Sequence, residues 1–386
     1  MTDGTNPETS SGGKPARKRA GEFDVMSLVQ PHLMAMPSYE PVEPIDVMAE
    51  RLGIPAERIV KLDGNENPYG PSPRVAEALA RYDYYHIYPD PAQRKVREAV
   101  AEYAGADPER IVFGVGSDEL LGMLAGMLLG PGDTIVNAPP TFGMYEFLGH
   151  VRDANVVNVP RREDFELDVP ALERALDRAK LLFLASPNNP TGNPLPQEQL
   201  QRLLSHNAVV AVDEAYAEFA GDSAAGLARR QDNLVVIRTF SKWAGLAGLR
   251  IGYAVLPKPL AKLIWNIKVP YNLSVAAEQA VLASLEDVDY LMANVRLLVE
   301  ERERMAAKLA EVPWLRTYPS AANFMLCEVA GIPGRDLKYE LRRRGILVRY
   351  FDTPMLRNCI RISVGKPEHT DRLMAALSEI GAAVRA

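Results

Sequence analysis

The sequence predicts an α/β protein with a large domain, built on a mainly parallel seven-stranded sheet covered by helices, and a smaller α+β domain. Short, continuously apolar runs alternate with helical patterns through the middle of the chain, as expected for parallel strands buried on both faces. After about Lys258 the pattern changes to a long charged helix followed by further strands. With 386 residues, of which 47% are hydrophobic, the chain can bury a sizeable core.

Seven apolar runs are predicted to form the large sheet. None contains a charged residue, and apolar side chains follow one another instead of alternating with polar ones, so both faces of the sheet should be covered. The runs are Ile111–Gly114, Thr134–Asn137, Val156–Val159, Leu181–Ala185, Val209–Val212, Leu234–Ile237 and Ile251–Val255.

The smaller domain is expected from the last third of the chain together with part of the N-terminal region. One long helix is predicted over Val281–Leu309, ending before Pro313. Residues 31–45 are rich in proline and are expected to be an extended arm. The remaining predicted elements are strands at Asn323–Val329, Ile346–Tyr350 and Cys359–Val364 and helices at 334–344 and 368–384.

These patterns divide the chain into four parts. Residues 1–24 are rich in Thr, Ser, Gly and Pro and have almost nothing to bury, so we expect a disordered tail. Residues 25–60 should form the N-terminal arm and part of the small domain. The large, ligand-binding domain is expected over 61–271, and the small C-terminal domain over 272–386.

Composition excludes several classes of function. The net charge of −6 gives no basic surface for nucleic acid or an anionic membrane. No apolar run approaches the roughly 20 residues that span a bilayer, and no apolar segment follows the basic N-terminal residues to make a secretory signal. Only two cysteines, Cys327 and Cys359, are present, which fits a reducing compartment and a cytoplasmic location. The histidines have no metal-ligand spacing, so no metal site is expected.

Polar loops follow several of the apolar runs, at the strand ends where open parallel sheets bind ligands. In Gly114–Glu119 two glycines follow a strand, and Ser117 or Asp118 can cap the helix that begins there. Free N–H groups at a helix start bind anions such as phosphate. Ser186–Gly192 has the Asn, Pro and Gly that favour a turn.

Two further strand ends carry ionisable residues. Asp213 closes an apolar strand, and a carboxylate there is either functional or a helix cap. Lys242 lies just after a buried strand, with Arg250 eight residues later. Most lysines are solvated and inert, and few lie directly at the end of a core strand.

Taken together, the four loops supply the groups that bind pyridoxal phosphate (PLP). Lys242 can hold this cofactor covalently as a Schiff base. Asp213 can keep the pyridine nitrogen protonated, so that the ring withdraws electrons. Asn189 and Tyr216 can hydrogen-bond the phenolic oxygen of the ring. The dianionic phosphate can be held by Ser117, Asp118, Ser241 and Arg250.

With these residues in place, the sequence resembles the class I and II aminotransferases of PLP fold type I. Over nearly all of residues 28–384 it is most similar to the histidinol-phosphate aminotransferase family. The motifs that carry the resemblance are Leu62–Gly70, Tyr88-Pro89, Gly116–Glu119, Pro139–Tyr145, Ser186–Gly192, Val212–Tyr216, Ser241–Arg250 and Ile360–Gly365.

The resemblance implies roles that the residues alone do not suggest. It implies a homodimer in which Tyr88 reaches the cofactor phosphate of the neighbouring subunit. Phe142 is implied to stack on the PLP ring, where the family usually has Tyr; Phe keeps the stacking surface but lacks the hydroxyl. Tyr39 is implied to close over the substrate. Asn65, in the first motif, is expected to bind the substrate.

Two arginines indicate the substrate. Arg361 alternates with apolar residues on a predicted strand, and Arg349 lies on the preceding one. Histidinol phosphate carries a phosphate of about two charges where most donors carry a carboxylate. A pair of arginines suits such a dianion, and it equally suits a dicarboxylate such as 2-oxoglutarate. The resemblance therefore implies transfer of the amino group from histidinol phosphate to 2-oxoglutarate, in histidine biosynthesis.

Alternatives with the same cofactor site stay open. An aromatic amino-acid aminotransferase would differ only in its side-chain pocket. A threonine-phosphate decarboxylase-like lyase would also bind a phosphorylated substrate. A PLP-binding transcription regulator is rejected, because only about 25 residues precede the arm, too few for a DNA-binding domain.

Overall fold

The computed structural model, which describes residues 23–36 and 41–385, contains the predicted seven-stranded sheet. All seven predicted strands are present, and neighbouring strands from β7 to β4 pair in parallel. Only β8 runs antiparallel to its neighbours, β2 and β7. In spatial order the strands are β2 (Ile111–Val115), β8 (Ile251–Val255), β7 (Leu234–Thr239), β6 (Val209–Asp213), β5 (Leu181–Ala185), β3 (Thr134–Asn137) and β4 (Asn155–Asn158).

Helices cover both faces of this sheet, as its apolar strands require. Every residue of β5 is buried, and because successive side chains point to opposite faces, Phe183 and Leu184 belong to two different core clusters. The edge strand β4 is mostly exposed. The covering helices include α4 (Gly116–Leu128), α5 (Met144–Val151), α6 (Val169–Leu176) and α7 (Gln197–Leu204).

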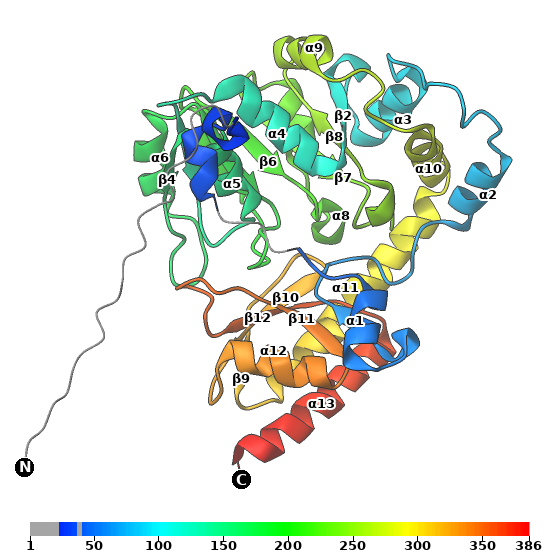
Figure 1. Ribbon diagram of the computed structural model, residues 1–386, viewed down its shortest axis with the longest axis vertical. Helices are drawn as coiled ribbons and strands as arrows, with labels where there is room; N and C mark the ends of the chain where they lie inside the picture. The colour runs from blue at the N-terminus through cyan, green and yellow to red at the C-terminus, as the bar shows by residue number, and fades with distance from the viewer. Residues whose placement is uncertain (1–22, 37–40, 386) are drawn as a thin grey trace, which may run out of the picture. The chain divides into compact units, whose positions relative to one another are not determined.

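A second, five-stranded sheet is built from both ends of the chain. Its strand β1 comes from the N-terminal part and pairs in parallel with β11, and the other neighbours pair antiparallel. Helices α12 and α13 lie on the side of this sheet away from the large one (Figure 1). The order is β1 (Val60–Leu62), β11 (Ile346–Tyr350), β12 (Cys359–Ser363), β10 (Phe324–Val329) and β9 (Leu315–Thr317).

The other helices complete the description of the fold. Among the described residues, no helix is long and apolar enough to cross a membrane. The α-helices are α1 (Ile45–Leu52), α2 (Pro73–Arg81), α3 (Arg94–Ala104), α8 (Ala217–Ala220), α9 (Lys258–Ile267), α10 (Val275–Leu285), α11 (Val288–Ala310), α12 (Gly334–Arg343) and α13 (Pro367–Arg385). Short 3-10 helices are Val25–Leu28, Pro31–Ala35, Ala56–Arg58, Pro108–Arg110, Ala224–Arg229 and Ala247–Leu249.

Two predictions of secondary structure were wrong. The single helix over Val281–Leu309 is two helices, α10 and α11, with a break at Glu286 and Asp287. A tertiary contact holds the break, because Ser72 at the start of α2 donates a hydrogen bond to the Asp287 carboxylate. In the expected extended arm, the residues from Pro31 form a 3-10 helix, with Pro in a helix-starting position. The expected tail lies almost entirely outside the described residues, and the four-part division of the chain stays a prediction.

Candidate active site

A cavity of about 980 Å³ lies at the carboxyl ends of the parallel strands, where the sequence placed a ligand. Residues of both sheets line it. Tyr39 lies outside the described residues, and Tyr88 does not line the cavity. All the other predicted site residues do: Asn65, Ser117, Asp118, Phe142, Asn189, Asp213, Tyr216, Ser241, Lys242, Arg250, Arg349 and Arg361.

Lys242 projects into this cavity from the loop after β7. Its Nζ donates a hydrogen bond to the main-chain oxygen of Gly64, 2.9 Å away, and lies 6.0 Å from the centre of the Tyr216 ring. Burial lowers the pKa of the amine to about 8, and the positive charge of Arg361 acts in the same direction. Because only the neutral amine is a nucleophile, this environment prepares Lys242 to attack a carbonyl near neutral pH.

Asp213 is the last residue of β6 and is 5% exposed. Its Oδ2 accepts a hydrogen bond from the Tyr145 hydroxyl at 2.9 Å, and its Oδ1 accepts one from the Ala215 N–H at 3.1 Å. Burial raises the pKa of the carboxyl to about 6, although the bond from Tyr145 opposes the shift. A carboxylate held in this way favours a positively charged partner, which would stabilise its ionised form.

The glycine loop after β2 brings a helix start next to Arg250. Gly116 has a φ of +73° and its N–H donates to the Arg250 main-chain oxygen at 3.0 Å. A side-chain carbon at Gly116 would clash with the Arg250 guanidinium. The Arg250 side chain forms a 3.1 Å ion pair with Asp118, and both side chains are nearly half exposed. The loop is therefore a close cradle of N–H groups and a guanidinium, as anion binding requires.

The expected capping of α4 by Ser117 or Asp118 was wrong. The helix begins at Gly116, so the capping position falls on Val115, which has no side-chain oxygen. The Val115 N–H instead donates to the Glu119 carboxylate at 2.6 Å. Ser117 and Asp118 consequently lie in the first turn, where helix N–H groups lack partners within the helix.

Ser241 faces the same end of the cavity from the loop before Lys242. The Thr239 hydroxyl donates to Ser241 Oγ at 2.9 Å, and the Ser241 N–H donates back to Thr239 Oγ1 at 3.1 Å. Since Ser241 Oγ already accepts a bond, its own hydroxyl hydrogen is left to donate to another acceptor.

The turn after β5 is organised by Asn188, a residue to which the sequence analysis gave no role. It is fully buried, and its amide donates to the Pro140 oxygen at 3.0 Å and to Thr191 Oγ1 at 2.8 Å. Thr141 donates to its Oδ1 at 2.6 Å. This network fixes the neighbouring Asn189, whose Oδ1 accepts a 2.6 Å hydrogen bond from Arg361.

Asn65 links the two sheets at the cavity wall. It is 1% exposed with a φ of +52°. Its amide donates to the Tyr216 hydroxyl at 3.0 Å, and its Oδ1 accepts from the Ser363 hydroxyl at 2.7 Å. Its main-chain oxygen accepts from Asn323 at 3.1 Å. These bonds give Asn65 a structural function, and its expected contact with substrate stays a prediction.

Arg349 and Arg361 lie side by side on adjacent strands. They are register partners across β11 and β12, so their side chains share one face of the small sheet. Arg361 is 6% exposed and also donates to the Asp63 main-chain oxygen. Each guanidinium lies 5.7 Å from the centre of the Phe351 ring. Two like charges on one wall of a cavity repel each other and attract an anion.

The two aromatic residues carried over by resemblance have different surroundings. Phe142 lines the cavity and packs edge-on against Tyr145, with ring centres 5.6 Å apart. Tyr88 is 79% exposed and stacks on Tyr271 at 4.7 Å, away from the cavity of its own chain.

Comparison with known proteins identifies the family. Residues 57–377 match the family described as aminotransferase class I and II. The chain belongs to the class I and II aminotransferases. The protein is therefore an enzyme that transfers amino groups between small molecules such as amino and keto acids, with PLP as its cofactor.

Individual aminotransferases are similar over most of the chain. The histidinol-phosphate aminotransferase of Roseiflexus castenholzii is 50% identical, over 92% of this chain and 99% of that protein. The chloroplastic histidinol-phosphate aminotransferase of Nicotiana tabacum is 47% identical, over 91% and 86%. The crystal structure of histidinol-phosphate aminotransferase from Sinorhizobium meliloti in complex with PLP superposes with a TM-score of 0.81 at 28% identity, covering 94% and 99%.

The site geometry of this aminotransferase fits its cofactor. A buried carboxylate, an amine of lowered pKa and a guanidinium beside a helix start face one cavity. The strand β8 passes close to that helix start because Gly252 has no side chain, and a carbon there would lie 2.7 Å from the Ser117 nitrogen. The donor groups of the cradle thus suit a phosphate, and the carboxylate suits a protonated ring nitrogen.

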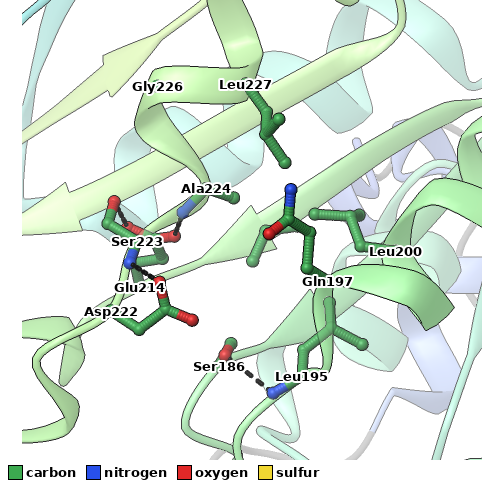
Figure 2. A pocket seen from close by; sticks show the side chains of 11 residues that line it. Ser186, Leu195, Gln197, Leu200, Glu214, Asp222, Ser223, Ala224, Gly226 and Leu227 are labelled. Atoms are coloured by element: carbon green, nitrogen blue, oxygen red, sulfur yellow. Dashed lines mark hydrogen bonds between the residues drawn. The ribbon is translucent and has the colours of Figure 1, made fainter.

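A smaller cavity, of about 200 Å³, is lined by residues from the loop after β5, from α7, from the end of β6 and from between Asp222 and Leu227 (Figure 2). Its wall includes Glu214, the residue that follows Asp213 in the sequence. Glu214 is 2% exposed. The Glu214 carboxylate accepts hydrogen bonds from the Ser223 hydroxyl and the Ala224 N–H. Burial raises its pKa to about 7. The two successive carboxylates therefore serve different sites, and Glu214 holds the turn at Ser223.

Sequence reasoning missed some residues that shape the site. Tyr145 lies in a motif used for the resemblance, yet its bond to Asp213 was not anticipated. Its local sequence gave no signal for this bond, because α5 begins only at Met144 and Asp213 lies 68 residues further along the chain. Asn188 gave no signal either, since Asn in a turn is ordinary.

Proposed function

We propose that this aminotransferase transfers the amino group of histidinol phosphate to 2-oxoglutarate, a step of histidine biosynthesis. The observation that carries the choice of donor is the pair of arginines, Arg349 and Arg361, on one face of the small sheet at the cavity. The proposal is supported by relatives named histidinol-phosphate aminotransferase at 50% and 47% identity over more than nine tenths of the chain.

Lys242 and Asp213 are assigned to the reacting end of the cofactor. When bound, PLP supplies a ring that withdraws electrons and stabilises negative charge at the substrate carbon. Lys242 would hold the cofactor covalently through its amine and would carry a proton to and from the substrate carbon. Asp213 holds a proton on the pyridine nitrogen, and Tyr145 keeps the carboxylate oriented for that task.

The remaining cofactor residues orient the ring and its phosphate. Phe142 stacks on one face of the ring. Asn189 and Tyr216 hydrogen-bond its phenolic oxygen, each steadied by a second partner, Arg361 or Asn65. The phosphate is held by Ser117, Asp118, Ser241 and Arg250, to which Asp118 contributes its main-chain N–H while its side chain orients Arg250.

The two arginines serve both substrates. Arg361 and Arg349 bind the phosphate of the donor, whose charge of about −2 is matched by two guanidinium groups. In the other half-reaction the α-carboxylate of 2-oxoglutarate uses the same anchor, Arg361. Tyr39 and Asn65 are assigned to the substrate side of the cavity.

The proposal includes a cytoplasmic homodimer with shared active sites. An exposed aromatic pair, Tyr88 and Tyr271, supports an interface at this surface. Tyr88 is assigned to the cofactor phosphate of the neighbouring subunit. In a mixed dimer of a Tyr88→Phe chain and a Lys242→Ala chain, the site with intact Lys242 receives an intact Tyr88. Its PLP affinity should be normal while the Tyr88→Phe homodimer binds PLP more weakly, and equal weakening in both would contradict the assignment.

An amino-donor panel tests the proposed substrate. With 2-oxoglutarate as acceptor, kcat/KM is measured for histidinol phosphate, phenylalanine, tyrosine and aspartate. Histidinol phosphate should be preferred. Preference for phenylalanine would replace the proposal with an aromatic amino-acid aminotransferase, and release of CO2 from threonine phosphate would indicate the decarboxylase.

A further inference from the structure

The turn between β2 and α4 is closed by a side chain of the helix. Strand β2 is an edge strand of the large sheet, so its N–H and C=O groups that point away from β8 have no strand partner. One of them, the Val115 N–H, donates to Glu119 Oε2 at 2.6 Å. The next N–H, that of Gly116, points the other way and donates to the Arg250 main-chain oxygen. The turn is therefore held on both sides.

Asn272 holds the Glu119 carboxylate in this position. Its Nδ2 donates to the same oxygen, Glu119 Oε2, at 3.0 Å and to the Phe113 main-chain oxygen at 3.1 Å. Its Oδ1 accepts from Lys268 Nζ at 2.9 Å and from Gln93 Nε2 at 3.1 Å. An ammonium group can only donate and a carboxylate can only accept, so these partners allow one orientation of the amide. Asn272 thus ties Glu119 to the edge of β2.

The turn that Glu119 closes leads into the proposed phosphate site. Ser117 and Asp118, in the first turn of α4, line the cavity, as does Arg250. Glu119 and Asn272 are not among the described residues that line it. They can therefore affect a bound cofactor only through the position of the helix start. Because a hydrogen bond weakens steeply when its geometry is distorted, a shift of this helix start would weaken bonds from its N–H groups to a phosphate.

The charge and the accepting oxygen of Glu119 have opposite effects on a bound phosphate. A negative side chain in the first turn stabilises a helix, but it repels a dianion nearby. An accepting oxygen without a charge would keep the hydrogen bonds and remove the repulsion. Glutamine supplies such an oxygen, and a single one is enough, because both bonds end on Oε2.

We propose that Glu119, held in place by Asn272, is a positioning residue for the phosphate of the cofactor. Its accepting oxygen fixes the turn between β2 and α4, so that Ser117 and Asp118 present their N–H groups to the phosphate. The proposal rests on the proposed function, which assigns the phosphate to the start of α4. It adds to that assignment two residues that do not touch the cofactor.

Binding of PLP and of pyridoxal to the full-length, cofactor-free enzyme tests the proposal without turnover. Pyridoxal has the same ring and aldehyde but no phosphate, so the ratio of its Kd to the Kd of PLP reports the contribution of the phosphate. The cyclic form that free pyridoxal adopts is common to all variants and cancels in comparisons with wild type. Equilibrium dialysis measures both Kd values.

Glu119→Leu should raise the Kd of PLP about tenfold, equal to about 1.4 kcal/mol, and leave the Kd of pyridoxal within about twofold of wild type. Glu119→Gln keeps the accepting oxygen and should bind PLP at least as tightly as wild type. A residue needed only for its charge would not be rescued in this way. Glu102→Leu, which changes an exposed glutamate of α3, should leave both Kd values unchanged.

Melting temperatures show whether each variant folds. If Glu119→Leu does not fold, Asn272→Ala decides in its place, because it keeps the carboxylate and removes one of its donors. It should raise the Kd of PLP about threefold or more without changing that of pyridoxal. Equal weakening of PLP and pyridoxal, or no change of either, in the deciding variant would overturn the proposal. Weakened PLP binding by Glu119→Gln would overturn it as well.

Arg250→Gln separates this proposal from the proposed function. The change removes a guanidinium assigned to the phosphate, so it should raise the Kd of PLP by at least about tenfold without affecting pyridoxal. If the ratio of the two Kd values is unchanged in Arg250→Gln, the assignment of the phosphate to this helix start is wrong. If the ratio changes in Arg250→Gln but not in Glu119→Leu, only the positioning role of Glu119 is wrong.

Discussion

The two ends of the active-site cavity are built in different ways. At the cofactor end, Asp213 and Lys242 lie on or just after single strands of the large sheet. At the substrate end, Arg349 and Arg361 come together only because β11 and β12 pair in register. The cofactor end can serve any aminotransferase, whereas the substrate end selects the donor. Substitutions at the cofactor end should therefore slow the reaction with every donor. Substitutions at the substrate end should slow it by different factors for different donors.

The largest effect at the cofactor end is expected for Lys242→Ala. This change removes both the covalent attachment and the proton carrier, so kcat should fall by at least about 10⁴-fold with every donor. Borohydride reduction of the wild-type enzyme followed by peptide mass mapping should place the label on Lys242. Label on another lysine would contradict the assignment.

A smaller and equally general loss is expected for Asp213→Ala. Without the carboxylate the ring nitrogen loses its proton, so kcat should fall by about 10²- to 10³-fold while PLP still binds. The loss should be in kcat, because the interaction strengthens as negative charge develops. Tyr145→Phe keeps the carboxylate and removes one donor, so it should cost only about tenfold or less. Near-normal turnover of Asp213→Ala would make this residue a structural cap.

The pH dependence of cofactor capture should reveal the environment of Lys242. With a pKa of about 8, the neutral amine makes up about a tenth of the total at pH 7 and about nine tenths at pH 9. The rate at which the cofactor-free enzyme captures PLP should therefore rise about tenfold between these values and then level off. Stopped-flow absorbance measures it. A rate that keeps rising tenfold per pH unit up to pH 10 would indicate an ordinary lysine.

The same difference between the two ends explains what could be read from the sequence. Lys242 and Asp213 were found because each lies at or just after the end of an apolar run, and the geometry of a parallel sheet brings strand ends together. Arg250 was found because it follows Lys242 by eight residues. The seven strands of the large sheet could be predicted from the same apolar runs. The local sequence was sufficient wherever a single segment forms the strand and also contributes the functional residue.

Features that depend on contacts between distant segments were missed. The break between α10 and α11 depends on Ser72, more than 200 residues away. The link from Asn65 to Ser363 spans 298 positions and has no local signature. Capping of α4 was wrong because Gly116 adopts a positive φ and is itself the first residue of the helix, so the capping position falls on Val115. In each case tertiary structure decided between local conformations that the sequence left open.

The most direct test of donor selection compares Arg349→Ala with Arg361→Ala in single-turnover half-reactions. Arg361→Ala should lower kcat/KM for histidinol phosphate by at least about tenfold, since a charged hydrogen bond contributes about 1.5–3 kcal/mol. It should also slow the half-reaction with 2-oxoglutarate. Arg349→Ala should lower kcat/KM for histidinol phosphate about tenfold more than for phenylalanine, whose single carboxylate needs only Arg361. Equal losses for both donors in Arg349→Ala, or faster wild-type transfer from phenylalanine than from histidinol phosphate, would contradict the account.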